Sequence, residues 1–315
     1  MDNRLIPLTD MEVSPICLGT MTFGTPVGEE EAIELVHYAI DSGVNFMDTA
    51  NMYEGYTRYI GSPGGVAEEI LGKALRGRRD QVVLATKVGM KVGDAPEDEG
   101  TSPAAIEKQL GRSLKRLQTD FVDIYYLHRP DPAVPMAEIV GALDEAIRQG
   151  KVRHYGVSNY SAKQLSELLT IADANNLPRP VICQPPLSLL KQDALSDLLP
   201  LCEKEHIAVA PYQVLQGGLL TGKYRRGRSI PEGSRKAEKA EWVWDLTDEL
   251  FDTLEEIEAQ AKQKGLSMTQ FALRWALAQP GVISALVGIK RLSQLDEAIS
   301  AAEVSIEYCR LNIVD

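Results

Sequence analysis

The sequence has no apolar run of about 18 residues, the length that a membrane-spanning helix needs, and its N-terminus, MDNRLIPLTD, lacks the apolar core of a signal peptide. Cysteine is scarce as well. The four cysteines, Cys17, Cys183, Cys202 and Cys309, show no CxxC spacing, so the sequence predicts neither a zinc site nor a disulfide framework. These absences favour a cytoplasmic protein with reduced thiols, no metal and no membrane partner.

Positive charge is also scarce. Lys and Arg number 33 against 45 Asp and Glu, which gives a net charge of −12. A phosphate backbone is bound through an excess of Lys and Arg, so we expect no nucleic-acid partner. The chain also lacks a GxGxxG motif opening a βαβ unit, since neither GTMTFG nor GSPGG at 61–65 has that pattern. No Rossmann domain is therefore predicted.

What the sequence does contain is an alternation of apolar strands and amphipathic helices. The candidate strands are ICLGT at 16–20, VNFM at 44–47, VVLAT at 82–86, FVDIYYL at 121–127, YGVS at 155–158, VIC at 181–183, IAVAPY at 207–212 and ISALV at 283–287. The candidate helices between them are 29–43, 103–117, 137–149, 161–174 and 193–205. Eight such units predict an α/β fold, a (β/α)8 TIM barrel.

The barrel is expected to be one domain over 1–315, because no linker or repeat divides the chain. RLIPLTD–MEVSP predicts an N-terminal β-hairpin ahead of the first barrel strand. Two long polar segments, 89–102 and 222–248, are expected at the C-terminal face, where barrels hold their active sites, and should determine substrate specificity. Within the second, the Arg and Lys group at 225–239 predicts a mobile polar loop rather than a phosphate site, with closure over a cofactor as an alternative.

Three polar residues follow successive strands of the predicted barrel. The second strand ends at Asp48, the third at Lys87 in LATKVG, and the fourth at His128 in YYLHRP. Because the carboxyl ends of parallel barrel strands meet at one rim, these side chains should converge, with Tyr53 folding back from the loop after Asp48. An acid, an amine, an imidazole and a phenol at one mouth predict a proton-transfer site.

Physical chemistry suggests a role for each group. Lys87, held by Asp48, should lower the pKa of Tyr53, because a nearby cation stabilises phenolate. Tyr53 would donate a proton to a carbonyl oxygen, and neutral His128 would direct an N–H at the same oxygen. None of these groups serves as a nucleophile, so the carbon must receive its electrons from elsewhere. A hydride from a reduced nicotinamide is the expected source.

At these residues the chain resembles the aldo-keto reductase family. The resemblance runs nearly end to end, through LGTMTFG at 18–24, MDTANMYEG at 47–55, LATKVG at 84–89, DIYYLHRPDP at 123–132, GKVRHYGVSN at 150–159, GGLLTGKY at 217–224 and FALRWAL at 271–277. It implies a catalytic tetrad of Asp48, Tyr53, Lys87 and His128, and NADPH bound across the barrel mouth. It also implies an oxidoreductase that reduces an aldehyde or ketone to an alcohol.

The resemblance further implies a set of cofactor contacts. These are Gly19, Thr20, Met21, Asp48, Ser158, Asn159, Gln184, Tyr212, Gln213, Val214, Leu215, Gly218, Leu220, Lys223, Gly288, Lys290, Arg291, Gln294 and Glu297. Ser158, Asn159 and Gln184 would hold the carboxamide, Tyr212 would stack on the nicotinamide, and Lys290 with Arg291 would clamp a 2′-phosphate. Ala298 stands where the family commonly has Asn, so NADH stays open as an alternative cofactor.

Three other functions agree with parts of the sequence. One is an NAD-linked sugar or polyol dehydrogenase. Another is a weakly catalytic nicotinamide sensor, since relatives of this fold serve as regulatory subunits of potassium channels. A metal-dependent or two-carboxylate hydrolase would need acidic or His pairs at several strand ends, and only Asp48 and His128 qualify. Tyr56 or Tyr59 is a candidate for the substrate pocket. The sequence leaves the oligomeric state open, with a monomer as the default.

Overall fold

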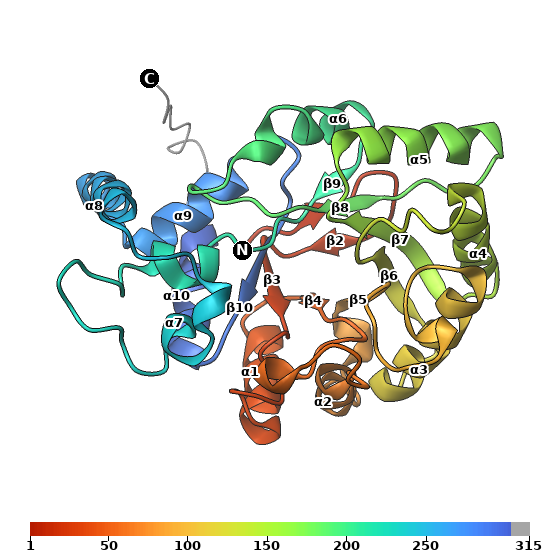
Figure 1. Ribbon diagram of the computed structural model, residues 1–315, viewed down its shortest axis with the longest axis horizontal. Helices are drawn as coiled ribbons and strands as arrows, with labels where there is room; N and C mark the ends of the chain where they lie inside the picture. The colour runs from red at the N-terminus through yellow and green to blue at the C-terminus, as the bar shows by residue number, and fades with distance from the viewer. Residues whose placement is uncertain (304–315) are drawn as a thin grey trace.

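A computed structural model describes residues 1–303, and Cys309 lies outside them. Its centre is a sheet of eight parallel strands in the order β10-β3-β4-β5-β6-β7-β8-β9 (Figure 1). The strands are β3 (Ile16–Gly19), β4 (Phe46–Asp48), β5 (Val83–Val88), β6 (Val122–Leu127), β7 (Val152–Ser158), β8 (Ile182–Gln184), β9 (Ala208–Val209) and β10 (Ala285–Gly288).

Hydrogen bonds between the segments at β9 and β10 close this sheet into a ring. The backbone N–H of Val209 donates to Gly281 O at 2.9 Å, and that of Ile283 donates to Val209 O at 2.9 Å. Farther along, the N–H of Leu286 donates to Pro211 O at 3.0 Å. The predicted (β/α)8 barrel is confirmed. The seventh strand is shorter than its predicted range of 207–212, because Pro211 has no N–H to pair.

Helices surround the ring and follow its strands in turn (Figure 1). They are α1 (Glu29–Asp41), α2 (Val66–Ala74), α3 (Pro103–Leu117), α4 (Met136–Arg148), α5 (Ala162–Ala174), α6 (Leu198–Lys204), α8 (Asp248–Gln263), α9 (Met268–Leu277) and α10 (Leu292–Ala302). The predicted helix at 193–205 is instead a 3₁₀ turn at Asp193–Leu195 and then α6. Pro200 explains the break, because proline is tolerated only in the first turn of a helix.

The N-terminal hairpin closes the bottom of the barrel. Its strands β1 (Arg4–Leu5) and β2 (Glu12–Val13) pair antiparallel, which confirms the predicted hairpin. Ile6, Met11 and Val13 are buried in the same apolar cluster as the inward-facing strand residues. The bottom is thus filled by side chains, and the opposite rim is left for a site.

Side chains alternate between the inside and the outside of the ring, as the strand period of two requires. On β5, Val83 and Ala85 belong to the inner cluster, whereas Leu84 packs outward against the helices. Lys87 continues the inward series, and Thr86 faces the helices. Within residues 1–303 no helix is both long and apolar enough to cross a membrane. Cys17, Cys183 and Cys202 are buried and free.

Candidate active site

The four residues of the predicted tetrad meet at the carboxyl ends of β4, β5 and β6. Asp48 is the last residue of β4, Lys87 is the next to last of β5, and His128 directly follows β6. Asp48 and Lys87 are fully buried. Tyr53 comes from the loop after β4, and its ring meets that of His128 edge to face, with 6.0 Å between centroids.

The Lys87 amine is the centre of the group. It donates to the Asp48 carboxylate, to Thr49 O at 2.9 Å and to the Tyr53 hydroxyl at 3.4 Å. These contacts account for the three N–H donors of an ammonium group. The amine is therefore fixed between a carboxylate that keeps it charged and a phenol that it can polarise.

Tyr126 forms the floor beneath this amine, with 5.9 Å between Nζ of Lys87 and the ring centroid. The ring is fully buried, and Gly156 on the neighbouring strand makes room for it. A Cβ at position 156 would lie 2.5 Å from Cε1 of Tyr126, closer than any real contact. Only glycine at this position leaves the ring, and hence the Lys87 amine above it, in place.

Burial and charge act in opposite directions on the buried pair. Burial raises the pKa of Asp48 above its ordinary value, although Lys87 and a hydrogen bond from Gln184 oppose the increase. Burial alone would lower the pKa of Lys87, but Asp48 and Tyr53 raise it above its ordinary value. The amine therefore stays protonated, and its charge keeps the neighbouring carboxylate ionised.

The predicted lowering of the Tyr53 pKa is wrong in net direction. Burial raises the pKa of Tyr53, and Asp48 adds to the increase, so that the opposing effect of Lys87 is outweighed. Tyr53 is consequently protonated at neutral pH, which is the form that a proton donor needs. Lys87 reduces the cost of forming phenolate relative to the same buried site without a cation.

His128 is held neutral. Burial lowers its pKa well below the usual value, and the positive charges of Lys87, Arg129 and Arg58 lower it further. Its Nδ1 atom is buried and has no hydrogen-bond partner among residues 1–303. A neutral imidazole carries one N–H and one lone pair, so this ring can serve as a hydrogen-bond donor at the mouth without carrying charge.

The neutral state of His128 predicts a pH effect on stability. Below about pH 6.5 the unfolded chain binds a proton at this residue and the folded chain does not, so the free energy of unfolding falls as the pH falls. Between pH 6.5 and 5.5 the free energy of unfolding of the wild type should fall by about 1 kcal/mol more than that of the His128→Gln variant. Urea unfolding of both proteins at the two pH values measures this difference. Parallel losses would contradict the prediction.

Gln184 and Ser158 support the tetrad from neighbouring strands. The Gln184 amide donates to the second Asp48 oxygen at 2.8 Å, and the Ser158 hydroxyl donates to Gln184 O at 2.9 Å. Both of these side chains are buried. The Asp48 carboxylate thus has a hydrogen bond on each oxygen, which fixes its plane.

Asn159 links the tetrad to the opposite wall. Its side-chain amide donates to His128 O at 2.8 Å, and its oxygen accepts from the Tyr212 hydroxyl at 2.7 Å. The residue has φ 62°, a left-handed conformation that Asn tolerates better than most residues. This conformation turns the Asn159 side chain back toward the cleft, which Tyr212 also lines.

The tetrad opens into a cleft of about 840 Å³. Most residues predicted to contact a cofactor line it: Gly19, Met21, Asp48, Ser158, Asn159, Gln184, Tyr212, Gln213, Val214, Leu215, Gly218, Lys223, Gly288, Lys290, Arg291, Gln294 and Glu297. Thr20 and Leu220 lie behind the wall. The Thr20 hydroxyl donates to Asp48 O at 3.1 Å, and Leu220 is buried in the outer core.

Four cations gather in this cleft, although the chain is strongly acidic. Burial lowers the pKa of Lys223, and the charges of Lys290, Arg235 and Arg291 lower it further. Lys290 forms an ion pair with Glu238. Arg291 precedes α10, and the N-terminus of a helix is itself favourable for an anion. This part of the cleft is suited to phosphate groups.

Arg235 was not predicted as a site residue. It lies in α7 (Arg235–Glu238), and its Nε donates to the Tyr56 hydroxyl at 3.2 Å. Trp242 packs against Tyr56 edge to face, with centroids 5.3 Å apart. The density of Arg and Lys at 225–239 was the available signal, but it did not indicate which residue faces the cleft. Tyr56 lines the cleft, whereas Tyr59 is 66% exposed and does not.

The residues after β10 have local partners as well. Gln294 accepts from the backbone N–H of Lys290 at 2.9 Å, and Glu297 accepts from the Ser267 hydroxyl at 2.6 Å. Ala298 lines the cleft beside them with no polar atom in its side chain. At the α10 end of the cleft, the polar groups available to a ligand are therefore the amide of Gln294 and the carboxylate of Glu297.

The expectation for the segment 89–102 needs correction. Residues of 222–248 line the cleft, but none of the described residues of 89–102 does. Arg129, which follows His128, forms an exposed ion pair with Glu99 of this segment at 2.9 Å. Direct contact with the cleft is therefore seen for 222–248 and not for the described residues of 89–102. The described part of the chain also shows no group of three or more His, Cys, Asp or Glu that could hold a metal ion.

The fold and the site define a class: a (β/α)8 barrel with an acid, an amine, a phenol and an imidazole at the carboxyl ends of its strands, next to a cleft that contains four cations. Comparison with known proteins gives the family. The model of the Aldo/keto reductase family matches residues 15–315, and the chain belongs to this family.

Relatives cover nearly the whole chain. The "Uncharacterized oxidoreductase YrpG" of Bacillus subtilis (strain 168) is 35% identical over 98% of this chain and 93% of its own length. The "Probable voltage-gated potassium channel subunit beta" of Arabidopsis thaliana is 33% identical over 96% of this chain and 92% of its own length. The "L-glyceraldehyde 3-phosphate reductase" of Escherichia coli (strain K12) is 33% identical over 96% of this chain and 87% of its own length. Family and relatives class the chain as an oxidoreductase.

Proposed function

We propose that this protein is an NADPH-dependent cytoplasmic reductase that converts an aldehyde or ketone to an alcohol. The observation that carries the proposal is the meeting of the Tyr53 hydroxyl, the His128 ring and the Lys87 amine at one end of a cleft that also contains a cationic cluster. Proton donors and phosphate-binding groups in one cleft support a reaction in which hydride transfer is coupled to proton transfer.

The residues of the cleft fit a nicotinamide dinucleotide. Lys223, Lys290 and Arg291 supply positive charge for its phosphates, and the Tyr212 ring supplies an aromatic surface on the wall beside the tetrad. Asn159 and Gln184 present amide groups at the same place. When bound, the reduced nicotinamide supplies the hydride that no side chain can provide. NADH is the alternative cofactor, since Ala298 offers no polar group.

The chain's own residues would handle the carbonyl oxygen. Tyr53 would donate its proton to that oxygen as the carbonyl group is reduced to an alcohol. Loss of this proton leaves a Tyr53 phenolate beside Lys87. The amine stabilises this phenolate until a proton returns from solvent. Neutral His128 donates an N–H to the same oxygen and so polarises the carbonyl bond, much as an oxyanion hole does. Asp48 keeps Lys87 charged throughout.

A nucleotide titration followed by a substrate screen tests the proposal. Protein fluorescence is measured with NADPH and NADH, and turnover is followed by loss of reduced-nicotinamide absorbance. The aldehydes include L-glyceraldehyde 3-phosphate, because one relative is named for its reduction. Reduction of any aldehyde with NADPH supports the proposal. Tight nucleotide binding with very slow turnover on all aldehydes would instead favour a nicotinamide sensor.

Arg291 provides the sharpest test of cofactor choice, because its side chain has no ion pair within residues 1–303 and lines the cleft. Arg291→Ala should weaken NADPH binding about tenfold or more and NADH binding by less than about twofold, since only NADPH carries a 2′-phosphate. Arg228→Ala, which removes the same charge from an exposed position outside the cleft, is the control. If Arg291→Ala weakened the binding of NADPH and NADH equally, Arg291 would not be the residue that binds the 2′-phosphate.

A further inference from the structure

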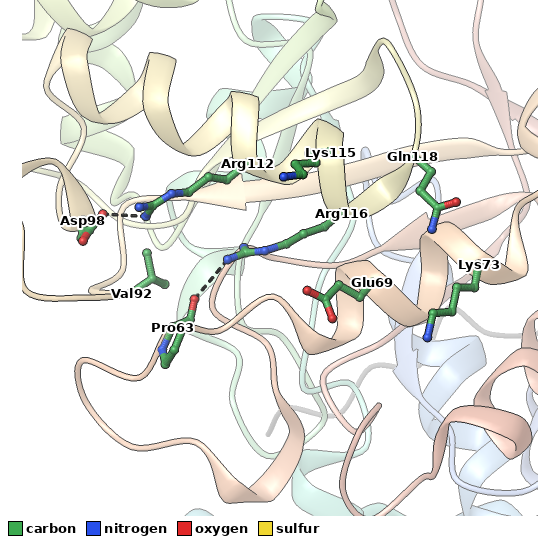
Figure 2. Close-up of a pocket in the computed structure, with 9 residues that line it drawn as sticks. All are labelled: Pro63, Glu69, Lys73, Val92, Asp98, Arg112, Lys115, Arg116 and Gln118. Atoms are coloured by element: carbon green, nitrogen blue, oxygen red, sulfur yellow. Dashed lines mark hydrogen bonds and ion pairs between the residues drawn. The ribbon is translucent and has the colours of Figure 1, made fainter.

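A second cavity, of about 600 Å³, lies on the outer side of the barrel between α2 and α3 (Figure 2). It shares no lining residue with the active-site cleft. Pro63 and Val92 form apolar parts of its wall, and the remaining lining is polar. Its volume lies within the range of cavities that bind small molecules.

Positive charge predominates in this cavity. Lys73, Arg112, Lys115 and Arg116 line it, against the two carboxylates of Glu69 and Asp98. Outside the lining, Lys73 is paired with Glu29 at 2.7 Å and Arg116 with Glu68 at 3.1 Å, so the excess of cations belongs to the side chains that face the cavity. A concentration of cations on an acidic protein is suited to an anionic ligand.

Arg116 is held in a fixed orientation within the cavity. One terminal nitrogen donates to Glu68 at 3.1 Å and the other donates to Pro63 O at 3.3 Å. Glu68 is fully buried, and Gly65 leaves the necessary space, because a Cβ there would lie 2.3 Å from the guanidinium. A guanidinium has five N–H donors, so further donors remain for a ligand. The group is thus positioned before any ligand arrives.

Lys115 and Glu69 are the uncommitted charges. Within residues 1–303 neither side chain forms a hydrogen bond or an ion pair, although both line the cavity. Asp98, by contrast, is already neutralised by Arg112 at 2.7 Å and by Lys108 at 3.1 Å. A ligand would therefore meet one unpaired ammonium, that of Lys115, and two guanidinium groups that are already paired with carboxylates but keep N–H donors to spare. Glu69 is left as an unpaired carboxylate that can accept from a hydroxyl.

We propose that this cavity is a second ligand site, which binds a small polyanionic metabolite through phosphoryl or carboxylate groups. Lys115, Arg112 and Arg116 bind the anionic groups, and Glu69 accepts from a hydroxyl of the same molecule. The site is connected to β5, the strand that carries Lys87. Glu68, which accepts from Arg116 in the cavity, also accepts from the Thr86 hydroxyl at 2.6 Å. It is distinct from the proposed reductase site and does not depend on it.

Isothermal titration with pyrophosphate and with citrate tests the site. Lys115→Glu should weaken binding of these probes about tenfold or more, because an attractive charge becomes a repulsive one. Lys163→Glu makes the same change on α5, where the side chain is 85% exposed and outside both cavities, and should alter binding by less than about twofold. Lys115→Ala removes the positive charge without adding a negative one, so it should weaken binding of the probes by an intermediate factor. It keeps the test valid if Lys115→Glu fails to fold.

The titrations are repeated with saturating NADPH, because the cations of the active-site cleft also attract these anions. Binding that persists with NADPH and depends on Lys115 supports the proposal. Binding of pyrophosphate but not citrate would define a phosphoryl site, and binding of both would define a general polyanion site. Absence of binding, equal effects of Lys115→Glu and Lys163→Glu, or complete displacement by NADPH would overturn it. Failure of NADPH to bind would instead contradict the proposed reductase.

Discussion

Tyr53→Phe should reduce kcat for aldehyde reduction by roughly 10²- to 10⁴-fold, the usual contribution of a positioned general acid. The substitution removes one hydroxyl, which accepts from Lys87 at 3.4 Å, and it leaves the ring that packs against His128. The cofactor phosphates are expected at Lys223, Lys290 and Arg291, so NADPH affinity should change by less than about twofold. Steady-state kinetics and a fluorescence titration measure the two effects separately.

The control for this experiment is Tyr59→Phe. Tyr59 lies six residues along the same loop, but its side chain is 66% exposed and does not line the cleft. Loss of its hydroxyl should leave kcat within about twofold of the wild type. If Tyr53→Phe retained most of the wild-type rate, the proton would have to come from another group, and His128 would be the next candidate.

The sequence was sufficient to predict the positions of the tetrad for a simple geometric reason. A strand alternates its side chains with a period of two, and parallel barrel strands end at one rim. Asp48 and Lys87 were predicted at one rim because each ends a predicted strand. Their even spacing from Phe46 and Val83, which face inward, explains why both point into the ring. Such rules depend only on local spacing and on the order of strands.

Other properties of the site depend on packing that no local pattern contains. The sign of the Tyr53 pKa shift follows from the balance between its burial and the charge of Lys87, and the sequence provides only the charge. Arg235 meets Tyr56 from 179 residues farther along the chain. The segment 89–102 was expected near the substrate, yet its Val92 and Asp98 line the second cavity instead. These features require the tertiary structure.

Lys87→Met should be strongly destabilising as well as inactive. Both charges of the Lys87–Asp48 pair are fully buried, and removing the amine leaves the carboxylate without its countercharge. Breaking a buried pair in this way costs about 3–5 kcal/mol of unfolding free energy. The same substitution at Lys191, whose ion pair with Asp193 is exposed, should cost less than about 1 kcal/mol. Urea unfolding of the two variants measures both values.

A double variant separates stability from chemistry at the same site. Adding Asp48→Asn to Lys87→Met removes the unpaired charge and keeps an oxygen that can accept from Gln184, so most of the lost stability should return. Turnover should not return, because the Tyr53 phenolate would form without a cation beside it. A double variant that recovered turnover together with stability would show that Lys87 acts only through folding, and the proposed proton transfer would then need no amine.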